Sequence, residues 1–477
     1  MLRLNPRATK RGACFSSLVF QISILMNPRI SRKPAILPRR LCIVGLWHQA
    51  TVLSACFARM GHWITTVGED EAAVTGLSRG RSPVVEPKLD AMLRRVIKSG
   101  HLKFTSHYDE AMDEAEFVFI AIDTPVNDQD EPQLESVVEA ARKVGRYWDT
   151  NSVLCVTSQV PVGTCESLAA LVCGQKAGTQ CDVAYVPEFL RFGDAVNAFF
   201  HADRFIIGAH RPEVAERVAQ LYLPLHRPVL RIGLRSAEMA KHACNAFLAT
   251  SISFINEIAN LCDRVDADSL EVAQAMKLDR RIGSQAPLSP SLGFARGALG
   301  RDLRALQNLG REHQCDTLLP NAVMSINRTR ATSVKQRLID HYESLVGLRI
   351  GVLGITYKPG TSTLRCSVAL EVIADLLAEG AEVRAYDPLA DWRELDWPIK
   401  FFAISDVYSV AEGCDALVLV TEWKGIFGLD FHRLRSTMRR PVFIDTRNLF
   451  NPLEMSRAGF LYSGLGRGRV PSVLAAP

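Results

Sequence analysis

An amine, an amide and a carboxylate in two segments of this 477-residue chain could together oxidise an alcohol. Lys241 and Asn245 stand four residues apart in a long helical pattern, so their side chains project from one face of that helix. Asp302 ends a glycine-containing loop that begins at Ser289. Such groups can take the proton of an alcohol while hydride leaves its carbon. The loop contains no cysteine, and Ala298 offers no thiol that could trap an aldehyde.

The helix face that carries Lys241 predicts an ammonium group with unusual properties. Ala237, Leu248 and Ile252 are expected on the same face, which would partly remove Lys241 from water. Desolvation would lower the pKa of Lys241 toward a value suited to proton transfer. Taken alone, Lys241 could instead be an ordinary lysine that extends from an amphipathic helix to reach water.

A strand–turn–helix pattern begins at Arg40 and predicts where a nucleotide could bind. The apolar run 41–44 fits a buried parallel strand, Gly45 breaks it, and a helix is expected over residues 50–60. Further strands are expected at residues 63–67, 116–122, 153–157, 183–185 and 204–207. This alternation predicts a doubly wound parallel sheet that binds its ligand at the carboxyl ends of the strands.

Two long helical patterns, over residues 237–265 and 318–343, follow the first sheet and predict a helical connector where two subunits could meet. A second α/β alternation then runs to about Arg467, with strands expected at 348–354, 383–386, 416–420 and 442–444. The predicted fold class is α/β, with two doubly wound parallel-sheet domains joined by a long central helix. The expected limits are a basic leader over 1–39, domains over 40–235, 236–345 and 346–468, and a disordered tail over 469–477.

Composition is that of a soluble globular protein, with 48% hydrophobic and 22% charged residues. Residues 1–40 hold nine Lys or Arg, and no acidic residue precedes Glu69; without a recognition motif this indicates a basic leader and not a nucleic-acid surface. An over-long start, with Met26 as initiator, explains the leader better than a secretory signal. No run is long enough to span a membrane. Twelve cysteines without a C-x-x-C pair indicate neither zinc nor disulfides and fit a cytoplasmic protein.

The turn after the first strand occupies the place of a dinucleotide fingerprint. Gly45 and Ala50 meet the needs for a tight turn and for close helix packing, but Trp47 stands where backbone should approach a pyrophosphate. The acid that usually binds ribose is replaced by Gly68, with Glu69 close behind. A sheet that no longer binds a dinucleotide well is the alternative. The residues favour neither NAD nor NADP decisively.

Three further loops are expected at the carboxyl ends of strands, where cofactors are lined. They are Thr124-Pro125, the stretch from Ser158 to Thr164, and the stretch from Pro187 to Gly193. In the last of these, Glu188 could bind a water or accept a proton, and Arg191 could contact a phosphate. Ordinary turn chemistry or a surface ion pair would also explain these residues.

From about residue 40 to residue 467 the chain resembles the UDP-glucose/GDP-mannose dehydrogenase family. The matching motifs are Thr124-Pro125, Pro187-Glu188-Phe189-Leu190-Arg191, Lys241 to Asn245, Phe254-Ile255-Asn256-Glu257, Asp279 to Gly283, Gly293-Phe294, Arg301-Asp302, Leu353-Gly354-Ile355-Thr356-Tyr357-Lys358-Pro359, Tyr386-Asp387-Pro388, Thr421-Glu422-Trp423 and Asp445-Thr446-Arg447-Asn448. The resemblance implies two Rossmann-like domains, the first for the dinucleotide and the last for the sugar nucleotide. It also implies a homodimer formed through the central helix.

The resemblance implies oxidation of the primary alcohol of a nucleotide sugar such as UDP-glucose, with NAD, in polysaccharide precursor synthesis. Lys241 and Asn245 would hold the sugar and stabilise its alkoxide. Asp302 would orient water or act as base, and Glu188 would assist hydrolysis. The cofactor would contact Gly45, Leu46, Trp47, Ala50, Thr124, Thr164, Arg301 and Arg365. The nucleotide sugar would contact Phe189, Leu190, Arg191, Lys241, Asn245, Arg281, Gly293, Phe294 and Lys358.

Departures from the family pattern bear on the second oxidation step. The family's nucleophilic cysteine is here Ala298, its paired loop glycines are Ala295 and Arg296, and its acidic pair before Arg365 is Ser362-Thr363. One branch of the family combines a Gly-Leu-Trp-His turn with a loop that lacks cysteine, and this chain resembles that branch.

Three functions are consistent with these residues. The preferred one is an active nucleotide-sugar dehydrogenase that stops at the aldehyde or continues to the acid. The second is a catalytically impaired paralogue that binds nucleotide sugar or partners in polysaccharide assembly. The third, a dehydrogenase for another hydroxy acid, fits the first domain but not the last. The sequence leaves the sugar open.

Overall fold

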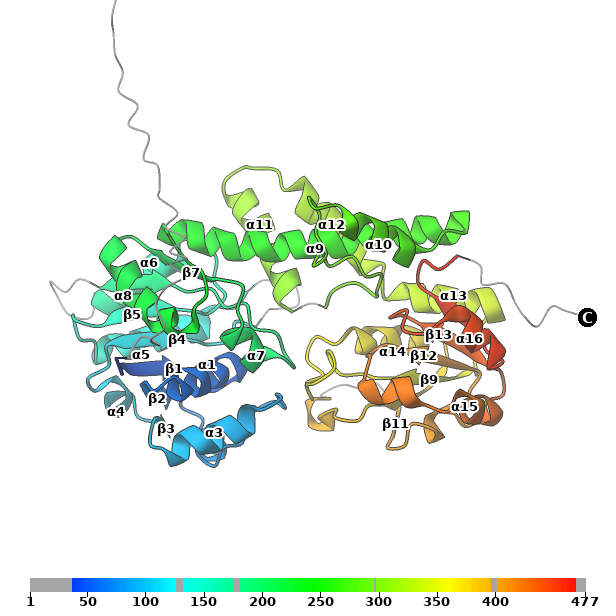
Figure 1. The fold of residues 1–477 in the computed structure, drawn as a ribbon, viewed down its shortest axis with the longest axis horizontal. Coiled ribbons are helices and arrows are strands. Elements are labelled where there is room, and N and C mark those ends of the chain that lie inside the picture. The colour runs from blue at the N-terminus through cyan, green and yellow to red at the C-terminus, as the bar shows by residue number, and fades with distance from the viewer. Residues whose placement is uncertain (1–36, 126–131, 175–180, 296, 396–400, 469–477) are drawn as a thin grey trace, which may run out of the picture. The chain divides into compact units, whose positions relative to one another are not determined.

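The structure is a computed structural model that describes residues 37–125, 132–174, 181–295, 297–395 and 401–468. Most of the predicted leader, the whole predicted tail and Arg296 lie outside the described residues. All the described residues belong to one compact unit. Figure 1 shows its order along the chain: a first sheet with helices around it, a group of long helices, and a second sheet.

The first sheet confirms the doubly wound α/β prediction and has the strand order β3-β2-β1-β4-β5-β6-β7-β8. Its strands are β1 (Arg40–Val44), β2 (Trp63–Val67), β3 (Leu102–Thr105), β4 (Phe117–Ile120), β5 (Val153–Val156), β6 (Asp182–Tyr185), β7 (Phe205–Ala209) and β8 (Val229–Ile232). Neighbours are parallel except β6 and β7, which are antiparallel. Strands β3 and β8 were not predicted from the sequence, because Lys103 in β3 and Arg231 in β8 interrupt their apolar runs.

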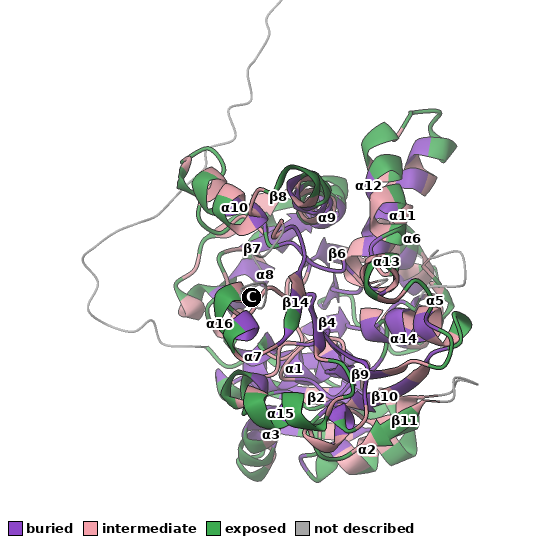
Figure 2. Ribbon diagram, turned by 90° about the vertical axis from the view of Figure 1, so that its right-hand side faces the viewer, coloured by how far each residue is buried: buried purple, intermediate pink, exposed green. Residues whose placement is uncertain are grey.

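Helices cover both faces of this sheet and bury its strands. They are α1 (His48–Arg59), α2 (Glu71–Ser78), α3 (Leu89–Lys98), α4 (Tyr108–Met112), α5 (Glu135–Arg146), α6 (Thr164–Cys173), α7 (Ala195–Phe200) and α8 (Pro212–Tyr222). Two apolar clusters form the core, one on each face, and alternate residues of β1 belong to alternate clusters. In Figure 2 the central strands β1 and β4 are accordingly buried, whereas helices such as α3 and α15 (Phe431–Thr437) show exposed faces.

The second sheet has the order β11-β10-β9-β12-β13-β14, and all its neighbouring strands are parallel. The strands are β9 (Arg349–Leu353), β10 (Glu382–Tyr386), β11 (Phe402–Ile404), β12 (Ala416–Leu419), β13 (Val442–Asp445) and β14 (Leu461–Gly464). Helices α14 (Val368–Ala378), α15 and α16 (Pro452–Arg457) pack with it. The two sheets confirm the prediction of two Rossmann-like parts.

The group between the sheets is dominated by α9 (Leu234–Val265), a helix of 32 residues. The other members are α10 (Ser269–Leu278), α11 (Ala298–Glu312), α12 (Leu318–Arg328) and α13 (Thr332–Tyr342). The single helix expected over 318–343 is therefore wrong. The chain breaks between α12 and α13, where the hydroxyls of Thr329 and Thr332 bond to the carbonyls of Ile326 and Thr329.

Two other expectations about this group need correction. Asp302 does not end a loop: α11 starts at Ala298, so Asp302 lies in its second turn. Leu248 is 40% exposed and does not share the buried face of Lys241, because the buried positions of α9 move on to Ala249 and Ser253. Among the described residues, no helix combines the length and the apolar character needed to cross a bilayer.

Candidate active site

The turn between β1 and α1 has the geometry of an anion-binding site. Gly45 adopts φ +132°, and a Cβ there would lie 2.7 Å from the carbonyl oxygen of Ala121, so only glycine fits. The first turn of α1 has no acidic residue, and Trp47 makes no side-chain cap. Within the described part of the chain, the N–H groups of Leu46 and Trp47 have no hydrogen-bond partner. These donors at a helix N-terminus suit the pyrophosphate of a dinucleotide.

Gly68 follows β2 and lies against the same turn. A Cβ at Gly68 would be 2.5 Å from Cγ of Leu46, so the side chain of Leu46 fills the space that an acid would need. Glu69, the next residue, pairs with Lys143 at 2.5 Å. Both line a cavity of about 390 Å3 at the carboxyl ends of β1 and β2. Leu46 therefore occupies the space beside Gly68, and an acid, Glu69, follows one position later.

The second sheet repeats this turn but closes it with its own carboxylate. Gly354 follows β9 as Gly45 follows β1, and each N–H bonds to the last carbonyl of the adjacent strand. Asp387 follows β10 at the place that Gly68 has after β2. Its Oδ2 accepts the N–H groups of Ile355 and Thr356 at 2.8 and 2.9 Å. The two N–H donors that remain free in the turn after β1 are thus occupied in the turn after β9.

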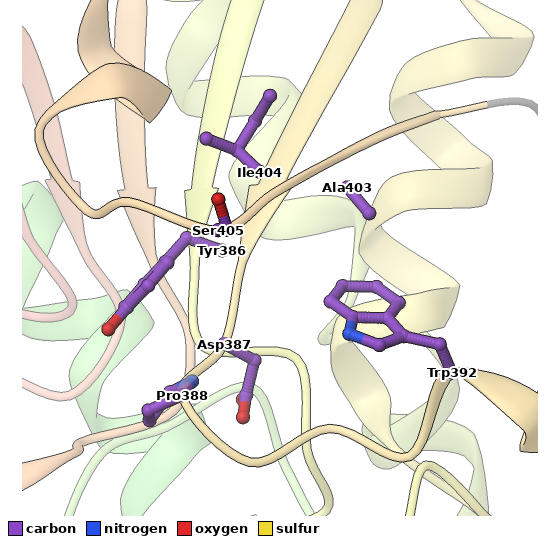
Figure 3. A pocket seen from close by; sticks show the side chains of 7 residues that line it. All are labelled: Tyr386, Asp387, Pro388, Trp392, Ala403, Ile404 and Ser405. Atoms are coloured by element: carbon purple, nitrogen blue, oxygen red, sulfur yellow. The ribbon is translucent and has the colours of Figure 1, made fainter.

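A cavity of about 430 Å3 lies beside this closed turn, at the carboxyl ends of β10 and β11 (Figure 3). Figure 3 shows Tyr386 and Trp392 on opposite sides of it, with Asp387 and Pro388 below. It is lined by Tyr386, Asp387, Pro388, Trp392, Ala403, Ile404 and Ser405. This cavity contains none of the residues that the sequence predicted for catalysis.

Lys241 is buried in α9 and points toward the loop that follows β6. Its ammonium donates a hydrogen bond to the carbonyl oxygen of Glu188 and lies 4.6 Å from the ring centre of Phe189. Burial lowers the pKa of Lys241, an effect that the charges of Asp302 and Glu188 oppose and that Arg301 reinforces. The structure thus gives Lys241 the desolvated environment that the helix pattern predicts.

Asp302 and Asn245 meet where α11 packs against α9. The amide nitrogen of Asn245 donates to Oδ2 of Asp302, which is fully buried. The sequence analysis missed His242, whose Nδ1 lies 2.5 Å from Oδ1 of the same carboxylate. Its position, between Lys241 and Asn245 on the buried helix face, was the signal that could have revealed it. The structure therefore brings Lys241, Asn245 and Asp302 together, with a histidine among them.

The half-buried Glu188 lies beside Lys241 at the carboxyl end of β6. Burial raises the pKa of Glu188 to about 7, although Lys241 and the backbone N–H of Phe189 act in the opposite direction. A carboxyl group with this pKa can exchange a proton near neutral pH.

Arg301 docks α11 on the first sheet. Its guanidinium donates to the carbonyl and the hydroxyl of Thr124 and to the side-chain oxygen of Gln159. The hydroxyl of Thr124 in turn donates to the carbonyl of Gln159 at 2.9 Å. The hydroxyl of Thr124 is therefore already occupied. Thr124 can still border a cofactor through its backbone, and Arg301 through its charge.

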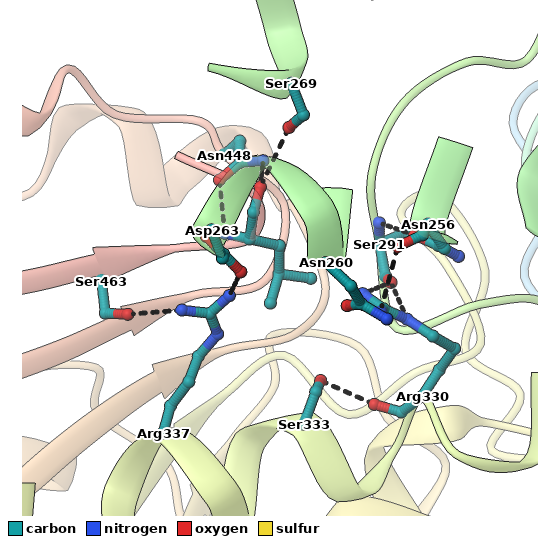
Figure 4. A network of polar contacts seen from close by, with 11 residues as sticks. Asn256, Asn260, Asp263, Ser269, Ser291, Arg330, Ser333, Arg337, Asn448 and Ser463 are labelled. Atoms are coloured by element: carbon teal, nitrogen blue, oxygen red, sulfur yellow. Dashed lines mark hydrogen bonds and ion pairs between the residues drawn. The ribbon is translucent and has the colours of Figure 1, made fainter. Parts of the chain in front are cut away.

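Side chains of α12 and of the break between α12 and α13 hold the loop that precedes α11. Asn327 bonds to both backbone groups of Phe294, each at 2.8 Å, and the buried Arg330 donates to the carbonyl of Ser291 at 3.0 Å. Figure 4 shows Arg330 reaching Asn260 of α9 as well, at 2.7 Å. Burial lowers the pKa of Arg330 to about 10. Sequence analysis missed both residues, which give the loop one defined shape.

The loop over residues 187–193 is held by a buried acid that sequence analysis also missed. Glu86 accepts the N–H groups of Gly193 and Ala195, each at 2.9 Å, and bonds to the imidazole of His48 at 2.8 Å. Burial lowers the pKa of Lys358, an effect that the charge of Glu86 opposes and that the charge of Arg191 reinforces, so Lys358 lies near this loop.

The remaining predicted residues are spread more widely. Arg365 lies 5.1 Å above the indole of Trp47, near the first turn. Thr164 begins α6, where the adjacent N–H groups of Gly163 and Cys165 already bond to the buried carboxylate of Glu238. Arg281 is 89% exposed and pairs with Asp279, so the structure does not bring it to the other site residues.

Comparisons with known proteins agree with this geometry. Residues 39–226, 235–329 and 351–452 match the NAD binding, central and UDP binding domains of the UDP-glucose/GDP-mannose dehydrogenase family. The UDP-glucose 6-dehydrogenase of Pseudomonas aeruginosa is 35% identical over 444 residues, which cover 90% of this chain and 98% of that protein. UDP-glucose 6-dehydrogenase TuaD of Bacillus subtilis is 34% identical over 438 residues, which cover 91% and 94%.

A solved UDP-glucose dehydrogenase from Pyrobaculum islandicum superposes with a TM-score of 0.84 at 31% identity, covering 91% of this chain and 99% of that one. The chain belongs to the UDP-glucose/GDP-mannose dehydrogenase family. It is an NAD-dependent nucleotide-sugar dehydrogenase. The open first turn, with its two unpaired N–H groups and the adjacent cavity, fits the dinucleotide.

Proposed function

We propose that this enzyme oxidises the primary alcohol of UDP-glucose or a closely similar UDP-sugar and so supplies a precursor for polysaccharide synthesis. The joining of Lys241, Asn245 and Asp302 across α9 and α11 is the observation that carries the proposal. The activities named for the Pseudomonas aeruginosa and Bacillus subtilis relatives support UDP-glucose. The matched UDP binding domain supports a uridine nucleotide.

In the proposed first step the substrate alcohol lies between the ammonium of Lys241 and the amide of Asn245. Both groups can donate hydrogen bonds to the alcohol oxygen and stabilise negative charge that develops on it. Asp302 takes the hydroxyl proton, because it is the carboxylate that contacts Asn245. Bound NAD supplies the nicotinamide that accepts the hydride. Gly45, Leu46, Trp47 and Ala50 would hold it, with Glu69 for its ribose.

In the proposed second step the aldehyde is oxidised as its hydrate. Ala298 starts α11 and has no group that can bond to the aldehyde carbon, so water adds instead and gives a geminal diol. After Asp302 has released its first proton to water, a diol hydroxyl would give its proton to Asp302 and the diol carbon would give a hydride to a second NAD, which yields the carboxylic acid. Glu188, with a pKa of about 7, would assist water addition, and Lys358 would contact the nucleotide diphosphate.

Counting NADH against sugar tests this function. The purified full chain is incubated with limiting UDP-glucose and excess NAD, and NADH is measured together with the sugar product. Two NADH per sugar and UDP-glucuronate are expected if the hydrate is oxidised, and one NADH with an aldehyde if oxidation stops early. Absence of NADH with UDP-glucose, UDP-N-acetylated sugars and GDP-mannose alike would refute the proposal.

The long α9 helix also supports the proposal that the enzyme is a homodimer. Phe247, Leu261 and Val265 are 70%, 58% and 70% exposed, a strong concentration of large apolar side chains on one helix. Sedimentation of the wild-type chain is expected to give a dimer, and Phe247→Glu with Leu261→Glu is expected to give a monomer. We further propose a cytoplasmic location, because NAD and nucleotide sugars are intracellular metabolites.

A further inference from the structure

The imidazole of His242 lies between the carboxylate of Asp302 and a backbone carbonyl. Its Nδ1 is 2.5 Å from Oδ1 of Asp302, and its Nε2 is 3.0 Å from the carbonyl oxygen of Val160. His242 is 2% exposed and Asp302 is fully buried, so water cannot replace either contact. Both ring nitrogens are therefore occupied by protein atoms.

These two contacts determine where the protons of His242 lie. A carbonyl oxygen only accepts hydrogen bonds, so Nε2 must carry a proton. The contact between Nδ1 and Asp302 needs a second proton, because two lone pairs at this distance would repel each other. Asn245 donates to the other oxygen of Asp302, which favours the charged carboxylate. The pair is thus an imidazolium beside a carboxylate.

Other charged groups surround this pair but bond elsewhere. Lys241 on the same helix donates to the carbonyl of Glu188, and Arg301 beside Asp302 donates to Thr124 and Gln159. Glu238, one turn before His242, accepts the N–H groups of Gly163 and Cys165. The other titratable groups on this side include Tyr185 of β6, Glu188 in the loop after it, and the thiols of Cys165 and Cys244. Of the described residues, only His242 places a cation in hydrogen-bond contact with Asp302.

We propose that His242 is a positioning residue that keeps Asp302 ionised and aims its free lone pairs at the sugar hydroxyl. The proposal deepens the proposed function and rests on it. During oxidation of the alcohol, the O–H and C–H bonds break, the proton passes to Asp302, and the hydride passes to NAD. His242 keeps both of its ring protons throughout. Ala298 cannot form a covalent intermediate, so Asp302 must accept a proton from both the alcohol and the aldehyde hydrate. A positive charge beside Asp302 keeps it ionised for both steps.

Two substitutions separate the orientation of Asp302 from the charge of His242. His242→Asn keeps a neutral donor near the place of Nδ1, and His242→Gln keeps one near the place of Nε2, toward Val160. Both remove the cation, so both should move the acidic limb of the kcat/KM profile upward by about one pH unit or more. His242→Gln also leaves Asp302 unoriented, so its kcat should fall at least about tenfold and further than that of His242→Asn.

His62→Gln is the matched control. His62 is also 2% exposed, but it precedes β2 at the amino ends of the strands, where its Nδ1 accepts the N–H of Arg39. This change should lower the melting temperature and leave the pH profile in place. If the two His242 variants do the same and keep the wild-type acidic limb, His242 is merely structural and the proposal is overturned.

A measurement without turnover separates failure of this proposal from failure of the proposed function. In protein labelled with 15N-histidine, the signal lost in His242→Asn should report two protonated ring nitrogens at pH 7 to 8. A neutral ring at that pH would overturn the proposal even in an active enzyme. If no nucleotide sugar yields NADH while the ring is an imidazolium, the proposed function fails and the assigned proton arrangement stands.

Discussion

His48 and Glu86 form a buried hydrogen bond that connects the dinucleotide turn to the loop that carries Glu188. Nε2 of His48 lies 2.8 Å from Oε2 of Glu86, and the same carboxylate accepts the N–H groups of Gly193 and Ala195. His48 begins α1 directly after the turn. One acid therefore holds the cofactor side and the sugar side of the site in register.

The first prediction concerns Glu86→Ala. Removing this carboxylate leaves the imidazole of His48 and two backbone N–H groups without their buried hydrogen-bond partner. At about 1–3 kcal/mol for each unsatisfied group, the free energy of unfolding should fall by about 3 kcal/mol or more. KM should rise for both NAD and the sugar nucleotide, because both loops lose their anchor. Chemical denaturation and steady-state kinetics measure the two effects. A rise in KM for one ligand alone would contradict the proposed link.

The second prediction concerns Glu188 and pH. Its pKa is raised to about 7, so between about pH 4.5 and 7 the folded protein binds more protons at Glu188 than the unfolded chain does. The corresponding stability is full below pH 4.5 and is lost as pH rises toward 7. Glu188→Gln should remove roughly 2–3 kcal/mol of this pH dependence, since Glu188 keeps some hydration. Denaturation curves at pH 5 and pH 8 for both proteins provide the measurement. If the free energy of unfolding changes by the same amount between pH 5 and pH 8 in both proteins, Glu188 does not titrate in this range.

The third prediction concerns Gly68 and Leu46. Gly68→Asp restores the usual ribose acid, but its Cβ would meet Leu46 Cγ at 2.5 Å, and such overpacking costs about 1–3 kcal/mol. The KM for NAD should therefore rise about tenfold. Adding Leu46→Ala should return it to the wild-type value or below, whereas Leu46→Ala alone should have little effect. Tighter NAD binding by Gly68→Asp without the second change would contradict the steric argument.

The fourth prediction concerns Ala298→Cys. A thiol there would start the 15-residue helix α11, and a helix N-terminus lowers the pKa of cysteine. Its reaction with iodoacetamide at pH 7 should be about tenfold faster than that of the natural Cys315, which is exposed beyond the other end of α11. Peptide mass spectrometry gives both rates in one sample. Slower labelling at position 298 would show that the helix end does not activate it.

Periodicity of apolar residues was enough to predict the two sheets and α9, because buried parallel strands and a long helix repeat their pattern over many residues. It failed where polar residues interrupt the pattern, as Lys103 does in β3. It also joined α12 and α13, because the hydroxyl bonds of Thr329 and Thr332 that mark the break depend on folded geometry. Local pattern therefore predicts elements better than it predicts their ends.

The predicted site was incomplete for a related reason. Lys241, Asn245 and Asp302 carry chemical types that suggest catalysis, and the structure brings them together. His242, Glu86 and Arg330 act by contacts with residues 38 to 109 positions away, and sequence spacing does not reveal such contacts. Conversely, Trp47 and Gly68 looked like losses of cofactor binding. In the structure, however, Gly68 packs against Leu46, and the N–H groups of the turn that contains Trp47 are free. Both residues are therefore compatible with an intact cofactor site.

Asp387 has a consequence for how the enzyme handles two ligands that both contain a diphosphate. A duplicated fold offers two equivalent turns, and at high NAD concentration the cofactor could occupy both and exclude the sugar. Because the carboxylate of Asp387 already accepts the N–H groups of Ile355 and Thr356, a second dinucleotide would meet repulsion there and find these two donors occupied. The enzyme should accordingly tolerate a large excess of NAD without substrate inhibition.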